Sequence, residues 1–198
     1  MQNQSLLKEL IQSLCCLPGI GQKSAQRMAF HLLQRNREGG LQLSQILGKA
    51  MQEISYCRDC RTFTETTVCE ICANASRDTE VLCIVESPAD VWILEQATGF
   101  KGQYFVLHGR LSPLDGIGPE QLGIDSLEQR MLQGRLKELI LATNSTVESQ
   151  ATAHFIAEIA NKHQIHTTRI AHGIPMGGEL EFIDSGTLSH AFKDRRAI

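Results

Sequence analysis

The sequence has no long hydrophobic run and none of the familiar signatures of a hydrolase or a nucleotide-binding loop. No apolar stretch approaches the roughly 18–20 residues that span a membrane. The opening residues, MQNQSLLKEL, have neither the apolar core nor the small-residue cleavage site of a secretory signal. No G-x-S-x-G, P-loop or Ser/His/Asp arrangement stands out, and we find no internal repeat. We therefore expect a cytoplasmic protein with no membrane partner.

The net charge is also small, but the charged residues are unevenly distributed along the chain. The 198 residues carry a net charge of −3, which disfavours a protein that binds nucleic acid over its whole surface. The first 50 residues, however, hold six Lys and Arg against two Glu, whereas the rest hold 13 Lys and Arg against 20 Asp and Glu. With 42% hydrophobic residues, the chain can bury one ordinary core plus small modules. We expect any contact with a polyanion to lie near the N-terminus.

Apolar residues recur at helical spacing before residue 55 and form short continuous runs after residue 80. The first pattern predicts two amphipathic helices around LPGIG (17–21), ended by Gly39–Gly40, and a third helix over about 43–54. The second pattern predicts strands that alternate with helices, which is typical of a parallel sheet covered on both faces. The expected strands are 81–85, 104–107, 138–143 and 168–171, and the expected helices are 88–99, 124–135 and 149–163. The tail, 177–192, predicts one more strand and a short helix.

Four of the seven cysteines form one tight cluster, C-x2-C-x8-C-x2-C. In a cytosolic chain this pattern indicates metal ligands rather than disulfides. Each C-x2-C pair places two thiolates on one turn, and four thiolates complete the tetrahedral coordination of Zn²⁺. Because the set is closed, we expect one structural zinc per chain rather than a catalytic one. The predicted ligands are Cys57, Cys60, Cys69 and Cys72.

LPGIGQKSAQR (17–27) is the second informative segment. Gly19 and Gly21 permit a tight hairpin between two helices, and the backbone N–H groups at the start of the second helix are free to bind phosphate. Lys23 and Arg27 are four residues apart and therefore share one helical face, away from the apolar side. Backbone amides together with two cations predict DNA binding without sequence preference. The alternative is an ordinary pair of helices with a solvated basic face.

Three acidic residues lie where the predicted strands end. Glu86 follows the first strand in VESPAD, Asp90 is just inside the next helix, and Glu148 follows the third strand. Ligand sites in open α/β sheets lie outside the carboxyl ends of the strands, so the three side chains are candidates to meet there. Three carboxylates suit Mg²⁺. The alternative is that they are solvated loop acids that cap helices.

The order of these segments resembles the RecR family of bacterial recombination mediators over essentially the whole chain. LPGIGQKSAQR, the two CxxC pairs, SPLDGIGP, ILATN and AHGIPMGGELEFID are all similar to segments of that family, in the same order. The resemblance implies an α+β chain of several modules. These are a helix-hairpin-helix region (1–54), a C4 zinc finger (55–78), an α/β Toprim domain with a parallel-type sheet (79–174) and a C-terminal strand and helix tail for oligomerisation (175–198).

The resemblance also implies a Toprim domain without catalysis. In catalytic Toprim proteins the first strand ends in Glu and a later strand ends in Asp-x-Asp. Here Glu86 matches, but Asn144, Ser145 and Thr146 stand in place of the second motif, so two-metal phosphoryl transfer lacks its ligands. The chain departs from the family at Ser145 and Ser149, where a proline and a glycine are expected. A Mg²⁺-dependent Toprim nuclease or nucleotidyltransferase is the alternative.

Partners follow from the resemblance rather than from the residue patterns. It implies a homotetrameric ring or clamp at the nucleoid that works with RecO and RecF to load RecA onto single-stranded gaps held by SSB. Carboxylates that lie close together repel one another until a cation arrives, and a basic patch on RecO or RecF would serve. We therefore expect Glu86, Asp90 and Glu148 to bind a partner protein.

Overall fold

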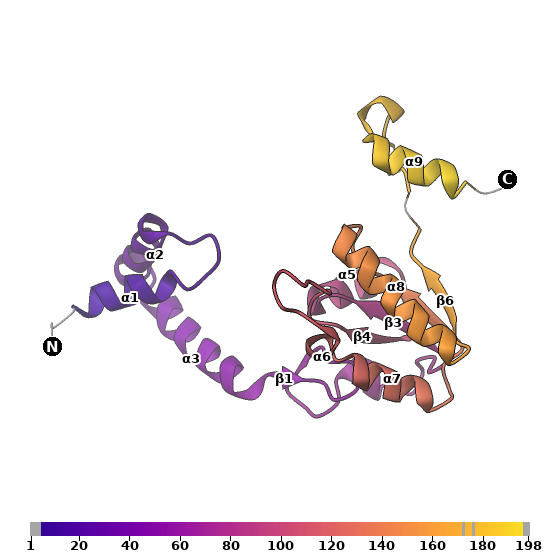
Figure 1. Cartoon of the computed structure of the whole chain (residues 1–198). Helices are drawn as coiled ribbons and strands as arrows, with labels where there is room; N and C mark the ends of the chain where they lie inside the picture. The colour runs from indigo at the N-terminus through magenta and orange to yellow at the C-terminus, as the bar shows by residue number, and fades with distance from the viewer. Residues whose placement is uncertain (1–4, 172, 176, 196–198) are drawn as a thin grey trace. The chain divides into compact units, whose positions relative to one another are not determined.

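The computed structural model describes residues 5–171, 173–175 and 177–195. Its backbone contacts divide the chain into two compact units, one ending at Ile54 and the other beginning at Ser55 (Figure 1). In these described ranges, no helix is both long enough and apolar enough to cross a membrane.

The N-terminal unit consists of three helices, α1 (Leu6–Leu14), α2 (Gln22–Arg35) and α3 (Arg37–Glu53). Helix α1 packs against α2, and α2 packs against α3. Within the described part of this unit, the buried side chains are those of Ala25 and Ala29, one turn apart on α2. Two small side chains let neighbouring helices approach closely, but they bury little apolar area. The expected pair of helices around LPGIG is confirmed.

The start of α3 differs from the expectation. Asn36 ends α2 and caps α3, because its Oδ1 accepts a hydrogen bond from the Gly39 amide at 3.0 Å. The helix therefore begins at Arg37 and includes Gly39 and Gly40, which were expected to end the preceding pair. The prediction of a start near residue 43 was wrong, since a side-chain cap outweighs the weak helix propensity of two glycines in the first turn.

The second unit is built on a four-stranded sheet of β3 (Val81–Val85), β4 (Gln103–Val106), β5 (Glu138–Leu141) and β6 (His166–Arg169). The strand order is β4-β3-β5-β6 and every pairing is parallel, as expected. The connecting helices are α5 (Pro88–Ala97), α6 (Pro119–Leu122), α7 (Ile124–Leu132) and α8 (Val147–Lys162). All four strands therefore end at one edge of the sheet, the carboxyl edge, at which the candidate acidic residues were expected.

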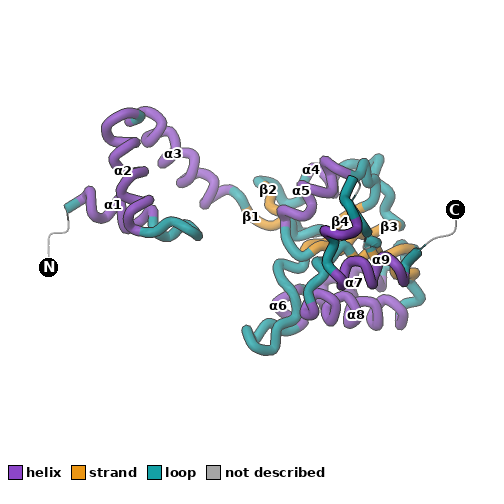
Figure 2. The backbone as a smooth tube through the Cα atoms, turned by 90° about the horizontal axis from the view of Figure 1, so that it is seen from above, coloured by secondary structure: helices purple, strands orange, loops and turns teal. Residues whose placement is uncertain are grey.

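The two faces of the sheet bury different partners because alternate residues of each strand point to opposite sides. Leu82 and Ile84 of β3 lie in one core cluster with apolar residues of α7 and α8, which run side by side in Figures 1 and 2. Cys83 and Val85 lie in a second cluster with Val91 of α5 and with the cysteines of the metal-binding segment. That segment therefore serves as a covering layer of the sheet.

The metal-binding segment and the tail contribute short elements. A two-stranded antiparallel sheet, β1 (Ser55–Tyr56) and β2 (Phe63–Thr64), precedes the short helix α4 (Glu70–Ala73). In the tail, a 3₁₀ turn η1 (Leu180–Phe182) leads into α9 (Ser185–Lys193), whose cap Asp184 accepts from the Thr187 amide at 2.9 Å. The short helix is confirmed. Among the described tail residues no strand forms, because LEF finds no neighbouring strand to pair with.

Candidate functional site

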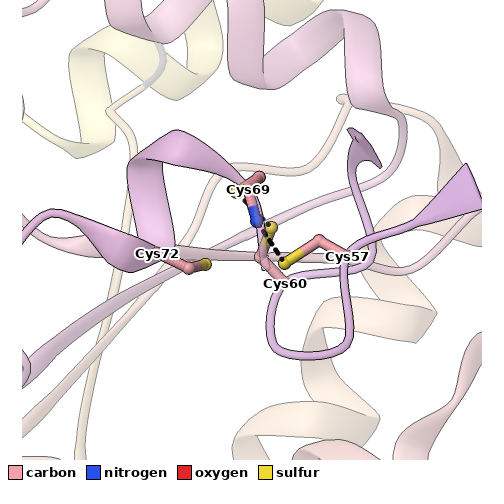
Figure 3. A group of neighbouring side chains, drawn as sticks. All are labelled: Cys57, Cys60, Cys69 and Cys72. Atoms are coloured by element: carbon pink, nitrogen blue, oxygen red, sulfur yellow. Dashed lines mark hydrogen bonds between the residues drawn. The ribbon is translucent and has the colours of Figure 1, made fainter. Parts of the chain in front are cut away.

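The four predicted metal ligands converge on one point. Their sulfur atoms all lie within 4.8 Å of one another, and the Sγ atoms of Cys60 and Cys69 are 3.5 Å apart. A tetrahedral site with Zn–S bonds of about 2.3 Å needs sulfurs about 3.8 Å apart, so the cluster already has the dimensions of a zinc site. Cys57 and Cys60 come from the loop after β1, and Cys69 and Cys72 from the start of α4 (Figure 3).

The thiol chemistry also fits a cation. The hydrogen bond between Cys60 and Cys69 raises the pKa of Cys60 and lowers the pKa of Cys69. The same neighbours raise the pKa of Cys72. Four thiols this close cannot all ionise by themselves, whereas Zn²⁺ would hold them all as thiolates. The Cys69 amide, 3.3 Å from the Cys57 sulfur, would stabilise that thiolate. These residues hold one structural zinc.

The zinc module is anchored to the sheet by its backbone. The Val106 amide donates to the Cys60 carbonyl at 2.9 Å. Arg130 on α7 donates to the carbonyls of Asp59 at 3.0 Å and Tyr104 at 3.2 Å, and burial lowers the pKa of its guanidinium. These contacts join the module, β4 and α7, so a loss of zinc affects more than residues 57–72.

The loop between α1 and α2 presents an open helix N-terminus. Gly19 has φ +78°, which favours glycine, whereas Gly21 is the N-cap of α2 at φ −88°, a conformation open to any residue. No side chain caps the helix, so its first N–H groups have no side-chain acceptor. A Cβ added at either glycine would meet no atom within 4 Å. The fold therefore leaves open space at both glycines, and the φ of Gly21 does not require glycine.

Two cations flank this N-terminus. Lys23 and Arg27 lie one turn apart on α2 and both are exposed. Over the ranges that the structure describes, neither side chain has a hydrogen-bond or ion-pair partner. The helix dipole adds partial positive charge at the same place. The loop and these two side chains therefore form one surface that suits a phosphate oxygen.

At the carboxyl edge of the sheet, Glu86 is hydrogen-bonded to Asn144, which stands where the Asp-x-Asp motif would begin. Glu86 is buried, with 6% of the residue exposed. Oε1 accepts from the Asn144 backbone amide and Oε2 accepts from Asn144 Nδ2, both at 2.8 Å. A carboxylate opposite Glu86 would repel it, whereas an amide satisfies both of its oxygens. Asn144 thus provides a hydrogen-bond donor to each oxygen of Glu86.

The other two acids are not gathered around Glu86. Asp90 belongs to the capping box of α5, where its Oδ2 accepts from the Ser87 amide at 2.8 Å. Glu148 is exposed in the first turn of α8. Within the described residues the four cysteines form the one group with metal-site dimensions, so the three carboxylates are not brought within metal-ligand distance of one another. The helix-capping alternative describes Asp90, and Glu148 faces solvent.

The departure at Ser145 and Ser149 leaves the start of α8 intact. Thr146 caps the helix and accepts from the Ser149 amide at 3.2 Å, and the Thr146 hydroxyl donates to Ser149 Oγ at 2.8 Å. Neither serine has a positive φ, and Ser149 is fully buried. This turn therefore needs neither proline nor glycine here.

Asn144 is the residue whose role the residue patterns did not reveal. The sequence showed that an acid was missing at this position, but not that its replacement would bind Glu86 from 58 residues away. His108 was missed in the same way. It follows β4, its Nε2 lies 2.7 Å from the Arg61 carbonyl, and burial lowers its pKa. One available signal was its place directly after a predicted strand.

Comparison with known families assigns each part of the chain. Models of the RecR helix-hairpin-helix (residues 7–51), the RecR four-cysteine zinc finger domain (54–74), the Toprim domain (80–171) and the RecR C-terminal region (173–196) all match. A helix-hairpin-helix, a four-cysteine zinc module and a Toprim sheet in this order define the class of multi-module Toprim proteins that carry a DNA-binding motif.

Curated relatives narrow the class to one family. The chain is 55% identical over 194 residues to a protein of Xanthomonas axonopodis pv. citri, and 56% identical over 193 residues to one of Xylella fastidiosa; each match covers 98% of both chains. It is 56% identical over 196 residues, 99% of both chains, to one of Methylococcus capsulatus. All three are named Recombination protein RecR. The chain belongs to the RecR family of recombination proteins.

Proposed function

We propose that this chain is a DNA-binding recombination mediator in recombinational DNA repair. The observation that carries the proposal is the surface at the start of α2, where uncapped N–H groups lie beside the exposed Lys23 and Arg27. Amides and cations bind phosphates, which every DNA sequence shares, so the contact has no sequence preference. Gly19 and Gly21 leave room for the DNA backbone. A repair protein that acts at damage in any sequence needs this lack of sequence preference.

In the same proposal, the Toprim domain has no catalytic activity. Both oxygens of Glu86 are already hydrogen-bonded to Asn144, and neither Asp90 nor Glu148 joins them. Mg²⁺ would have to displace two hydrogen bonds at a site with a single carboxylate, whereas phosphoryl transfer needs a cluster of them. This geometry disfavours a Mg²⁺-dependent nuclease or nucleotidyltransferase. The buried Glu86 and the capping Asp90 then have structural roles, which leaves Glu148 as the accessible acid for a basic partner.

Partners and assembly complete the proposal. RecO and RecF are the proposed partners, with RecA loading at single-stranded gaps as the outcome, in the cytoplasm at the nucleoid. Helix α3 leaves a row of large apolar side chains more than half exposed, which supports assembly into a homotetrameric clamp. These residues are Leu41, Leu43, Ile46, Leu47 and Met51. The four-part division at residues 54, 78 and 174 belongs to this proposal too.

A loading assay tests the function. RecA is added to gapped DNA coated with SSB, and filament formation is followed by RecA ATP hydrolysis, with and without this chain and RecO. We expect faster filament formation with both proteins and no faster formation with the Lys23→Ala, Arg27→Ala double variant. A parallel incubation with Mg²⁺ and supercoiled plasmid should show no nicking. Nicking that Glu86→Ala abolishes would overturn the proposal and restore the enzyme.

A further inference from the structure

Two aromatic side chains of the β1–β2 sheet are stacked and exposed. Tyr56 and Phe63 are direct cross-strand partners, with ring centroids 5.4 Å apart and ring planes inclined by 21°. Their exposed fractions are 58% and 57%. Cross-strand aromatic pairs commonly stabilise a hairpin, but this pair leaves more than half of each residue in contact with water. The pair therefore offers aromatic surface to a ligand.

A third ring is fixed against this pair from the end of β4. The ring of His108 packs edge-on against Tyr56, with centroids 4.6 Å apart. Its Nε2 lies 2.7 Å from the Arg61 carbonyl oxygen, and because a carbonyl only accepts, Nε2 carries the proton. His108 and Arg61 both have left-handed backbones, at φ 61° and 64°. Non-glycine residues adopt this conformation at a cost, and such positions cluster at ligand sites.

Two arginines are close in sequence to the residues that carry these rings. Arg58 is two residues from Tyr56; its side chain is 70% exposed and pairs with Asp59 at 3.0 Å. An exposed pair of this kind is weak, so Arg58 can exchange Asp59 for a phosphate at little cost. The exposed Arg110 is two residues from His108, which places its Cα within about 7 Å of the His108 Cα. Exposed stacked rings with arginines two residues away in sequence suit single-stranded nucleic acid, which presents base faces and phosphates together.

We propose that Tyr56 and Phe63 form a stacking platform for the unpaired bases of single-stranded DNA, with Arg58 and Arg110 beside its phosphates. This inference rests on the proposed DNA-binding function and adds a second contact to it. The start of α2 binds phosphates and so accepts single or double strands. A stacking platform needs a base that is not already stacked in a duplex. The platform therefore gives the protein a preference for single strands.

Ring-removal variants of the full-length, zinc-loaded chain test the platform. Tyr56→Leu and Phe63→Leu keep an apolar side chain in the hairpin but remove the ring. Trp92→Leu is the matched control, because it removes a ring of α5 that is 71% exposed. Affinity for a labelled single-stranded oligonucleotide and for its duplex is measured over a series of salt concentrations.

We expect each hairpin variant to weaken single-strand binding by roughly 5- to 150-fold, the range for removal of one stacked base. Its salt slope should stay unchanged, because the cations that neutralise phosphates are all still present. Duplex affinity should not change, and Trp92→Leu should bind as wild type does. Single-strand affinity that stays at the wild-type value overturns the platform. So does an equal loss on both substrates, which would indicate a folding role, or a loss of RecO binding instead of DNA binding.

A measurement on the wild type keeps the test independent of variant folding. Iodouracil-substituted single-stranded DNA is photo-crosslinked to the chain, and the modified peptide is mapped by mass spectrometry. A crosslink at Tyr56 or Phe63 supports the platform, and crosslinks confined to other segments contradict it. The two proposals fail in different ways. A wild-type chain that binds no DNA refutes the proposed function, whereas a chain that binds DNA equally well without the rings refutes the platform alone.

Discussion

Asn144→Ala tests the contact that distinguishes this carboxyl edge from a metal site. Alanine keeps the backbone amide but removes Nδ2, so Oε2 of Glu86, a residue only 6% exposed, loses the partner that it has at 2.8 Å. A hydrogen bond to a charged group contributes about 1.5–3 kcal/mol. We expect the free energy of unfolding to fall by about 2–3 kcal/mol and Tm to fall by about 5–10 °C.

Asn144→Asp sharpens the test because it replaces the donor with a second carboxylate. A carboxylate at this exposed position repels Glu86 and donates no hydrogen bond to it, so at pH 8 the loss should exceed that of alanine. Two facing carboxyl groups share a proton more readily in the folded state than in the unfolded chain. The folded variant therefore binds more protons, and its stability relative to wild type should improve as pH falls from 8 to 5.

Urea unfolding followed by far-UV circular dichroism at pH 8 and pH 5 measures both variants against wild type. At pH 8 the alanine variant should show the smaller deficit of the two, because it removes a donor without adding a second carboxylate. The reasoning is refuted if alanine costs less than about 0.5 kcal/mol, the range of an ordinary surface substitution. An aspartate deficit that does not change with pH would also refute it. Retained zinc in each variant is the control.

Three further outcomes are expected. The wild-type chain purified without chelator should contain about one equivalent of zinc, and a content under about half an equivalent contradicts this. Cys60→Ser should lose the zinc, and its amides in residues 57–72 and in the β4 face packed on them should exchange hydrogen faster than in the wild type. Gly21→Ala should keep the free energy of unfolding within about 1 kcal/mol of the wild-type value. It should weaken DNA binding, because its Cβ enters the space left for phosphate. An unchanged DNA affinity would show that Gly21 is not part of the site. Glu148→Ala should weaken RecO or RecF binding in surface plasmon resonance with DNA affinity intact, and equal partner affinity argues against Glu148.

Features that depend on local chemistry could be predicted from the sequence. The spacing of the four cysteines determines that two turns bring their sulfurs together, and the structure places all four within 4.8 Å. The runs VLCIV and YFVL are continuous because both faces of the sheet are covered, so they predict buried parallel strands. Helix α2 follows from its apolar repeat after a glycine loop.

Features that depend on distant partners could not be predicted in this way. Whether Glu86 faces a metal or an amide depends on Asn144, which reaches it only through the pairing of β3 with β5. The zinc module could be recognised from its cysteines, but its role as a covering layer of the sheet depends on the backbone bond between Val106 and Cys60. The tail segment LEF has the composition of a strand, yet a strand forms only where another lies beside it.

The salt dependence of DNA binding shows whether Lys23 and Arg27 neutralise phosphates at the start of α2. Affinity of the wild type and of the Lys23→Ala, Arg27→Ala double variant is measured at several salt concentrations on two unrelated DNA sequences, with helicity checked by circular dichroism. We expect the variant to bind more weakly to the same degree on both sequences. Its slope of log K against log salt should be lower by about 1 for each phosphate that it no longer neutralises. An unchanged affinity and slope, with the helices intact, would contradict it and move the DNA site away from α2.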